Sequence, residues 1–385
     1  MVTHSRVSMA FLALLVASLL TGCSPSAQPP ATTAPAPQVN PTVQTPAAKQ
    51  VSPEEIAWNK IVEIAKKQGT VTFYTTAPFI GDVNVVLSDA FKKRFGITLN
   101  IIVASGGSTW GERLKTEKRM GQQVGDVLFT SLSWAMNFKA DGLTAAAPDL
   151  PVLKRKDIWR VNPLHVDTEG HLLLVMINEH HPFANANLLK PKDEPTSYYD
   201  FLQPKWKGKK IIVEDPRVSS LEYLHFTPLV NAGAMKWEFF ADLAKQEPLL
   251  SLPAGGTEAV LSRGEAIVSL SSPDLLIAPL VLQGIPLKSL SMKEGDTANV
   301  SPMLLLNGAP HPNAARLFIN WFLEGEGAAI LAKEGTLVTN STVPDMRPDI
   351  IKSKSPKQHV ITLKDAEDMG KLQREGLVTK LLGLK

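Results

Sequence analysis

Residues 69–109 read GTVTFYTTAPFIGDVNVVLSDAFKKRFGITLNIIVASGGST. Two runs rich in β-branched residues, 71–74 and 99–104, predict strands, because such side chains favour an extended backbone. Residues 83–95 between them place apolar side chains at helical spacing and predict a helix. The alternation continues to residue 129 and indicates a βαβαβ unit, which is typical of a parallel sheet covered by helices.

A second region of the same kind follows a connection that is rich in Pro and Lys and ends at Lys209. Strands are predicted at 210–214 and 266–270, with helices between them. A later strand at 286–291 is expected to run back to the first region. We therefore predict an α/β protein made of two lobes that are joined by crossing strands.

The first residues have the order of a secretory signal peptide. Arg6 precedes an apolar run at 7–20, which is shorter than the roughly 20 residues that a membrane-spanning helix needs. The run closes on LTGC at 20–23, which matches the lipobox of bacterial lipoproteins. We predict that residues 1–22 are removed and that Cys23 receives a diacylglycerol on its sulfur. The alternative is an ordinary signal peptide with a chance cysteine, and the absence of any other cysteine in the chain weighs against it.

Residues 23–50 are mostly Pro, Ala, Thr, Gln and Ser, without acidic or aromatic side chains. Such a composition cannot bury enough apolar surface to fold. It predicts a disordered stalk that carries a globular part away from the membrane.

Composition limits the partners and the sources of stability. A single cysteine allows no disulfide within the chain, but 385 residues with 44% hydrophobic content are enough to build a core. The net charge is +3 and the charges are interspersed, so no basic stripe indicates nucleic acid as a partner.

Six segments occur in the order and spacing of a known family. They are GTVTFYT at 69–75, GDV at 125–127, DFLQPKWKGK at 200–209, EDPR at 214–217, RGEA at 263–266 and HPNAARLFINWF at 311–322. With these segments the chain resembles the family 1 extracellular solute-binding proteins of ABC importers, in the branch of the ferric-iron-binding proteins.

The resemblance implies the periplasmic-binding-protein type II fold, an α/β fold with a ligand cleft between two lobes that close about a hinge. On this basis we expect lobe 1 at 51–170 and 288–345, and lobe 2 at 171–287. The tail at 346–385 is not placed by the resemblance.

In this fold the ligand is held by loops at the C-terminal ends of strands. In the first region these loops contain Thr75, Thr76, Ser105, Gly106, Gly107, Ser108 and Ser131. The run at 105–108 precedes a helix, so its backbone amides gather at the positive end of a helix dipole and suit an anion. Simple helix capping is the alternative for this run and for Ser131. Trp110 could cover a ligand or pack inside its lobe.

The second region contributes Arg217, Ser271 and Ser272. Arg217 is the only evident cation among these loops, and its planar fork could grip a carboxylate or phosphoryl group with two hydrogen bonds. The alternative is that it pairs with Glu214 or with another acid on the surface.

Many members of the resembled family bind ferric iron through two adjacent tyrosines, and the corresponding stretch here reads Ser271-Ser272-Pro273. The pair Tyr198-Tyr199 lies in another segment, and we expect His180-His181 in a connecting loop. His225 follows Glu222 by three residues on an expected helix, where an ordinary polar pair is commoner than a metal site. The loops therefore favour a small oxygen-rich or anionic solute over iron.

We predict a monomer that makes and breaks no covalent bonds, carries no cofactor or metal, and delivers its solute to ABC permease subunits. Its contact with the membrane is the N-terminal lipid, and its place is outside the cytoplasm. Three alternatives stay open: a ferric-iron-binding protein of the same fold, a lipid-anchored hydrolase, and a surface sensor. The sequence contains no Gly-x-Ser-x-Gly, His-Glu-x-x-His or phosphate-loop motif, but a Ser, His and Asp set could still be assembled by folding.

Overall fold

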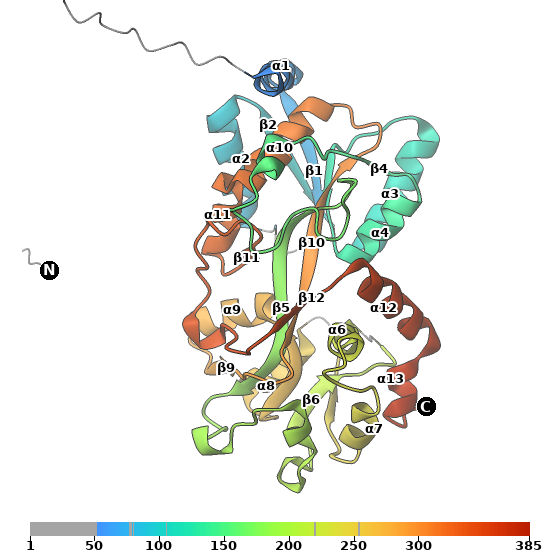
Figure 1. Ribbon diagram of the computed structural model, residues 1–385, viewed down its shortest axis with the longest axis vertical. Coiled ribbons are helices and arrows are strands. Elements are labelled where there is room, and N and C mark those ends of the chain that lie inside the picture. The colour runs from blue at the N-terminus through green and yellow to red at the C-terminus, as the bar shows by residue number, and fades with distance from the viewer. Residues whose placement is uncertain (1–51, 77–78, 80, 105, 219–220, 253–254) are drawn as a thin grey trace, which may run out of the picture. The chain divides into compact units, whose positions relative to one another are not determined.

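The computed structural model describes residues 52–385 apart from 77–78, 80, 105, 219–220 and 253–254 (Figure 1). The expected signal peptide, the stalk, Cys23 and Ser105 lie outside the described residues. The chain separates into a unit at 1–50 and a unit at 51–385, and every described residue belongs to the second. No helix of this described part is both long and apolar enough to cross a membrane.

Twelve strands form one mixed sheet within the described residues. Eight follow the order β2-β1-β3-β10-β5-β8-β6-β7, and the short strands β4, β9, β11 and β12 pair with β5 or β10. The strands are β1 (Thr70–Thr75), β2 (Thr98–Val103), β3 (Val127–Phe129), β4 (Thr144–Ala145), β5 (Leu173–Asn185), β6 (Ile211–Glu214), β7 (Leu249–Ser251), β8 (Val268–Pro273), β9 (Leu287–Ser289), β10 (Asp296–Leu306), β11 (Leu337–Val338) and β12 (Gln358–Val360).

The long strands β5 and β10 run through two lobes and connect them (Figure 1). The first half of β5 pairs with β10 and β11, and its second half pairs with β8 and β9. We call the part built on β1 to β4 and β11 lobe 1, and the part built on β6 to β9 lobe 2. A further connection leaves β11 and enters η5 (Asp349–Ile351), which packs beside β9.

Helices cover both faces of the sheet in each lobe, because successive strand residues point to opposite faces. In lobe 1, one core around Phe318 lies under α1, α2, α10 and α11, and another around Trp110 lies under α3 and α4. In lobe 2, a core around Phe240 lies under α5, α6, α7 and α13, and a smaller one around Ile277 lies under α8 and α9. The helices are α1 (Pro53–Gln68), α2 (Asp82–Phe95), α3 (Gly107–Met120), α4 (Leu132–Ala140), α5 (Leu221–Leu224), α6 (Thr227–Asn231), α7 (Phe239–Ala244), α8 (Gly256–Arg263), α9 (Asp274–Leu282), α10 (Pro312–Glu324), α11 (Glu326–Lys333), α12 (Leu363–Glu375) and α13 (Leu377–Leu381), with 3-10 turns η1 (Pro151–Lys154), η2 (Pro191–Asp193), η3 (Tyr198–Leu202) and η4 (Pro204–Trp206).

The ends of α1 show how local chemistry sets an element. The side chain of Ser52 accepts the backbone N–H of Glu55 at 3.1 Å, and Pro53 occupies the first helical position. Gly69 closes the helix with a φ of 71°, a conformation that glycine adopts without a steric penalty. The chain then turns directly into β1.

Two expectations about the crossing region are wrong. His180 and His181 lie inside β5 and not in a connecting loop. The strand continues through Pro182 because its pairing with β8 shifts register between His181 and Phe183, where a missing N–H is tolerated. The strand expected at 286–291 does not cross: β9 stays beside β5, and β10 makes the crossing.

The tail at 346–385 forms η5, β12, α12 and α13. β12 pairs in parallel with residues 296–298 of β10, near the passage between the lobes. α12 lies against helices of both lobes, and α13 adds Val378 and Leu382 to the core of lobe 2.

Candidate ligand-binding site

The pairing of the strands makes the two lobes present corresponding edges to each other. β1, β2 and β3 are parallel, and β3 and β5 are both antiparallel to β10, so these strands point toward lobe 2 as β5 does. β8 is antiparallel to β5 and parallel to β6, and β6 is parallel to β7, so these strands point toward lobe 1. The C-terminal ends of both sets therefore face the passage between the lobes, where ligands bind in open α/β sheets.

The end of β1 is fastened to the start of α3. Thr75 is fully buried, and its hydroxyl donates to the carbonyl of Thr76 at 3.1 Å. The carbonyl of Thr75 accepts the indole N–H of Trp110 at 3.1 Å, and that indole stacks on the ring of Tyr74 with centroids 4.4 Å apart. Of the two roles considered for Trp110, the structure shows packing inside lobe 1.

The predicted residues at the starts of α3 and α4 lie together. A Cβ atom on Gly107 would lie 2.2 Å from Cγ of Trp134, which belongs to α4, so only glycine allows this approach. Ser108 is exposed and borders a cavity of about 330 Å³ between the two helices. Ser131 is exposed directly before α4, with its Oγ 3.3 Å from Oγ of Ser133. Its side chain makes no capping bond to the helix.

Ser271 and Ser272 are buried inside β8, and not in the loop that was expected after this strand. They lie beside two buried glutamates, Glu222, which the sequence suggested only as a partner of His225, and Glu258, which it did not suggest. The carboxylate of Glu222 accepts the backbone N–H groups of Glu214, at 2.5 Å, and of Ser271. Burial, and then the neighbouring Glu214 carboxylate, raise the pKa of Glu222 well above its ordinary value. Burial also raises the pKa of Glu258, which lies near Ser272. No sequence signal distinguished these two glutamates from the exposed ones on short helices.

Arg217 forms an ion pair with Asp215. Pairing with a surface acid was the alternative to ligand binding that the sequence left open for this arginine. Its Nε lies 2.9 Å from Oδ1 of Asp215 and its Nη2 lies 2.6 Å from Oδ2. This hydrogen bonding lowers the pKa of Asp215 below its ordinary value. The guanidinium side chain remains 46% exposed at the end of β6, so a part of it faces solvent.

A pair of stacked histidines lies under this edge of lobe 2. The ring centroids of His180 and His225 are 3.3 Å apart, and both side chains are buried. Burial lowers the pKa of His225 to about 3, and burial together with His225 lowers the pKa of His180 well below its ordinary value. Both rings are therefore neutral at physiological pH. Among the described residues, no group of three or more His, Cys, Asp and Glu side chains is arranged to hold a metal ion.

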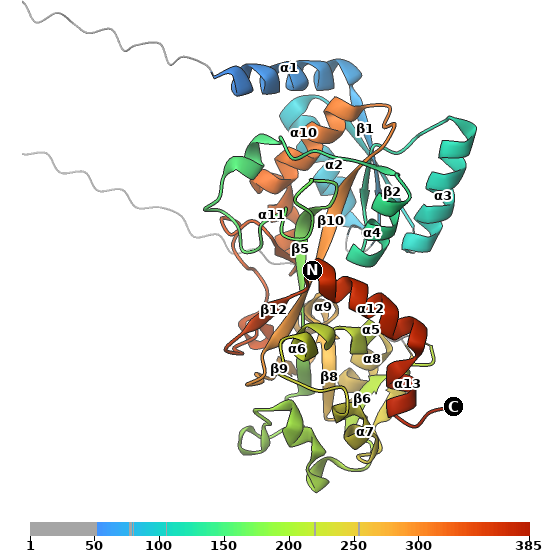
Figure 2. The ribbon, with the colours of Figure 1, turned by 45° about the vertical axis from the view of Figure 1, so that its right-hand side comes forward.

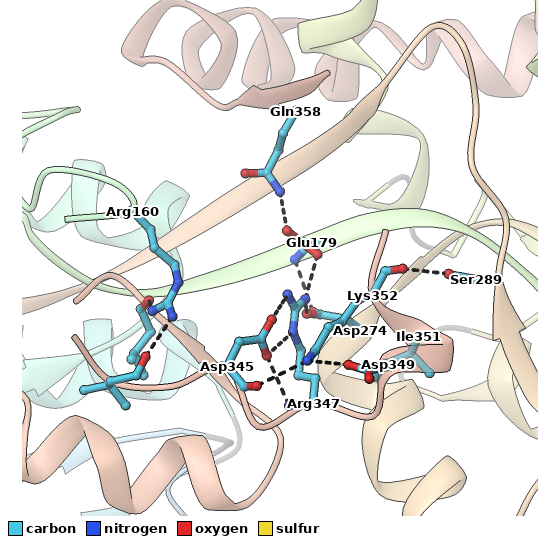
Figure 3. A network of polar contacts seen from close by, with 12 residues as sticks. Arg160, Glu179, Asp274, Ser289, Asp345, Arg347, Asp349, Ile351, Lys352 and Gln358 are labelled. Atoms are coloured by element: carbon cyan, nitrogen blue, oxygen red, sulfur yellow. Dashed lines mark hydrogen bonds and ion pairs between the residues drawn. The ribbon is translucent and has the colours of Figure 1, made fainter. Parts of the chain in front are cut away.

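A buried ionic network fastens the connection after β11 to β5 (Figure 3). Arg347 on that connection bonds to Glu179 of β5, to Asp274 at the start of α9, and to Asp345. Arg160 holds the earlier part of the same connection through the carbonyls of residues 338, 340 and 343. The structure thus places the described site residues in two groups, one in each lobe, at strand ends and helix starts.

Comparison with solved structures identifies the same fold in bacterial transport proteins. Iron-bound HitA from Pseudomonas aeruginosa is 20% identical and superposes with a TM-score of 0.61, covering 80% of this chain and 99% of its own. IdiA (FutA) from Trichodesmium, in complex with iron and citrate, is 17% identical with a TM-score of 0.64, covering 82% and 100%. AfuA from Actinobacillus pleuropneumoniae, with fructose-6-phosphate bound, is 20% identical with a TM-score of 0.60, covering 82% and 98%.

At these identities the structural likeness establishes the fold, and the predicted periplasmic-binding-protein type II fold is confirmed. No curated protein sequence matches the chain. A family described as bacterial extracellular solute-binding protein matches residues 87–358, which is more than half of the chain. The description of this family places its members outside the cytoplasm, where they bind solutes for transport. The chain belongs to the bacterial extracellular solute-binding protein family.

Proposed function

We propose that this protein captures a small oxygen-rich or anionic solute between its lobes and delivers it to the permease subunits of an ABC importer. The observation that carries the proposal is the pair of facing strand edges, which bear hydroxyl groups and glycines in lobe 1 and serines with an arginine in lobe 2. The proposed contacts are Thr75, Thr76, Ser105, Gly106, Gly107, Ser108, Ser131, Arg217, Ser271 and Ser272.

The charges at this edge support an anionic or neutral solute. α3 directs its free N–H groups toward the passage, and the N-terminus of a helix attracts negative charge. Burial raises the pKa values of Glu222 and Glu258 and so disfavours negative charge on these side chains beside a bound anion. The negative charge of Asp215 is offset by Arg217.

A thermal-shift screen tests the proposal with the mature chain carrying Cys23→Ser. The panel contains sugar phosphates, inorganic phosphate, citrate and other small carboxylates, uncharged sugars, a polyamine, and ferric salts with and without citrate. A ligand that binds only the folded state adds about 2.7 kcal/mol of stability at a hundredfold excess over its Kd. A shift with one class of oxygen-rich solute supports the proposal, and a shift with the polyamine alone contradicts it.

Ferric iron is the second candidate because HitA and FutA were solved with iron. Oxygen ligands from Glu222 and Glu258 would suit a hard cation, although serines stand where the family places adjacent tyrosines. A thermal shift with ferric salt that citrate does not require would select this candidate. A shift only with ferric citrate would instead select the carboxylate as the recognised group.

The proposal includes a lipid anchor on Cys23 after removal of residues 1–22, and a monomer that acts without a cofactor or any covalent step. Two acyl chains hold a protein on a bilayer durably where one does not. Labelled palmitate should enter the wild-type chain in cells and should be lost in Cys23→Ser. Equal labelling of the wild-type protein and of Cys23→Ser would exclude the lipid anchor on Cys23, but it would not bear on solute binding.

A further inference from the structure

The C-terminal helix α12 uses two different faces to contact the two lobes. It follows β12, which lies on β10 near the passage, and it packs against α4 of lobe 1 and against α5 and α6 of lobe 2 (Figure 2). Leu363, Ala366 and Met369 recur at three-residue spacing and share one face of the helix. Asp365 and Asp368 occupy a second face, rotated from the first by more than a quarter turn.

The acidic face binds lobe 2 through hydrogen bonds. Nδ2 of Asn231, the last residue of α6, donates to Oδ1 of Asp365 at 2.8 Å and to Oδ2 of Asp368 at 3.0 Å. Beyond α12, α13 buries Val378 and Leu382 in the core of lobe 2. These bonds and this burial make α12 and α13 part of lobe 2.

The apolar face meets lobe 1 through weaker contacts. Ala366 and Met369 pack, partly buried, against the core cluster that contains Trp110 and Leu132. Leu363 is 45% exposed and borders a cavity of about 310 Å³, together with Met136 and Lys139 of α4 and with Val166 and Leu172. Among the described residues no hydrogen bond or ion pair joins α12 to α4. This seam depends on apolar contact, whereas lobe 2 also holds α12 with hydrogen bonds, so the seam is the side that separates more easily.

We propose that α12 is a latch between the lobes: it stays on lobe 2, and its apolar contact with α4 favours the closed arrangement of the lobes. The inference rests on the proposed function, in which the lobes open and close around a solute. Opening the passage separates α4 from α12 and exposes Leu363, Ala366 and Met369 to water. The latch therefore sets the fraction of open, loadable protein before any solute arrives.

Energy transfer between two dyes measures the latch without a solute. The mature chain carrying Cys23→Ser receives Met120→Cys at the end of α3 and Lys245→Cys directly after α7, two exposed positions on different lobes. Leu363→Ala with Met369→Ala should raise the ratio of open to closed molecules by about tenfold, because closure of the lobes then buries less apolar surface. Lys371→Ala, exposed on the same helix, is the matched control and should leave the ratio unchanged.

A substitution that is expected to reduce the fraction of open molecules completes the test. Ala140→Leu, at a position of α4 that borders the cavity, should add apolar contact across the seam and reduce the open fraction. Leu363→Ser alone, at a half-exposed position, replaces the double variant if that chain fails to fold, and it should raise the open fraction. An unchanged ratio in the Leu363 variants, or the same direction of change for Leu363→Ser and Ala140→Leu, would overturn the latch. Because no solute is present, a failed solute screen leaves this result valid.

Discussion

Nη1 of Arg347 lies 2.6 Å from Oε2 of Glu179 and joins two segments that pass between the lobes (Figure 3). Glu179 is on β5, and Arg347 is on the connection that leaves β11 for η5. The same guanidinium also meets Asp274 and Asp345, and its side chain is only 4% exposed. The crossing segments are thus held at one buried point while the lobes on either side have separate cores.

Arg347→Met should destabilise the protein strongly, because it leaves Glu179 and Asp274 buried without their cation. Removing one partner of a buried ion pair costs about 3–5 kcal/mol. The free energy of unfolding in urea measures the loss. Arg263→Met removes the exposed pair with Glu265 and should change the stability little, because solvent screens exposed ion pairs, which makes it the control. Equal effects of both substitutions would show that the Arg347 network contributes little.

The stacked histidines should make the protein sensitive to acid. Their folded pKa values lie below the ordinary value near 6.5, so their contribution to stability is complete above that pH and is lost as the pH falls toward about 3. For His225 the loss at pH 5 is about 2 kcal/mol. His225→Phe keeps an aromatic ring beside His180 and should reduce the loss between pH 7 and pH 5, measured by urea unfolding. Identical pH profiles for the variant and the parent would contradict this reading.

Gly107 and Gly106 offer a matched pair of substitutions at the start of α3. Gly107→Ala would place a Cβ against the indole of Trp134, and overpacking of this kind costs about 1–3 kcal/mol. Gly106→Ala meets nothing within 4 Å and has extended backbone, so it should leave the melting temperature nearly unchanged. Thermal unfolding of both variants checks the difference. Similar losses in the two would mean that α3 and α4 do not approach as closely as described.

The sequence predicted the strands and helices whose signals are local. β1 and β2 lie where β-branched runs were found, because each run is bounded by a turn or a helix start. β5 continues through Pro182 although proline usually ends a strand, and this proline is tolerated because of a register shift that only the partner strand reveals.

The sequence could predict candidate site residues only where it also predicted the end of a strand. The place of Ser131 follows from its position after β3, whereas Ser271 lies inside β8 and not in the loop expected after that strand. The burial of Glu222 depends on three elements meeting in space. The position of α12 could not be predicted from the sequence either, because the contacts of its two faces are defined only when both lobes are folded. Tertiary contacts, and not composition, decide such positions.

Calorimetric titration with the best solute of the screen tests most directly whether the solute is held between the lobes. Ser131→Ala changes lobe 1 and Arg217→Gln changes lobe 2, both at exposed side chains whose loss should not affect folding. Arg263→Gln removes a similar exposed arginine pair away from the strand ends and is the control. We predict that each of the first two weakens binding by about tenfold or more, since a charge-assisted hydrogen bond contributes about 1.5–3 kcal/mol, and that the control binds as the parent does. Unchanged affinity in both Ser131→Ala and Arg217→Gln would contradict a site between the lobes.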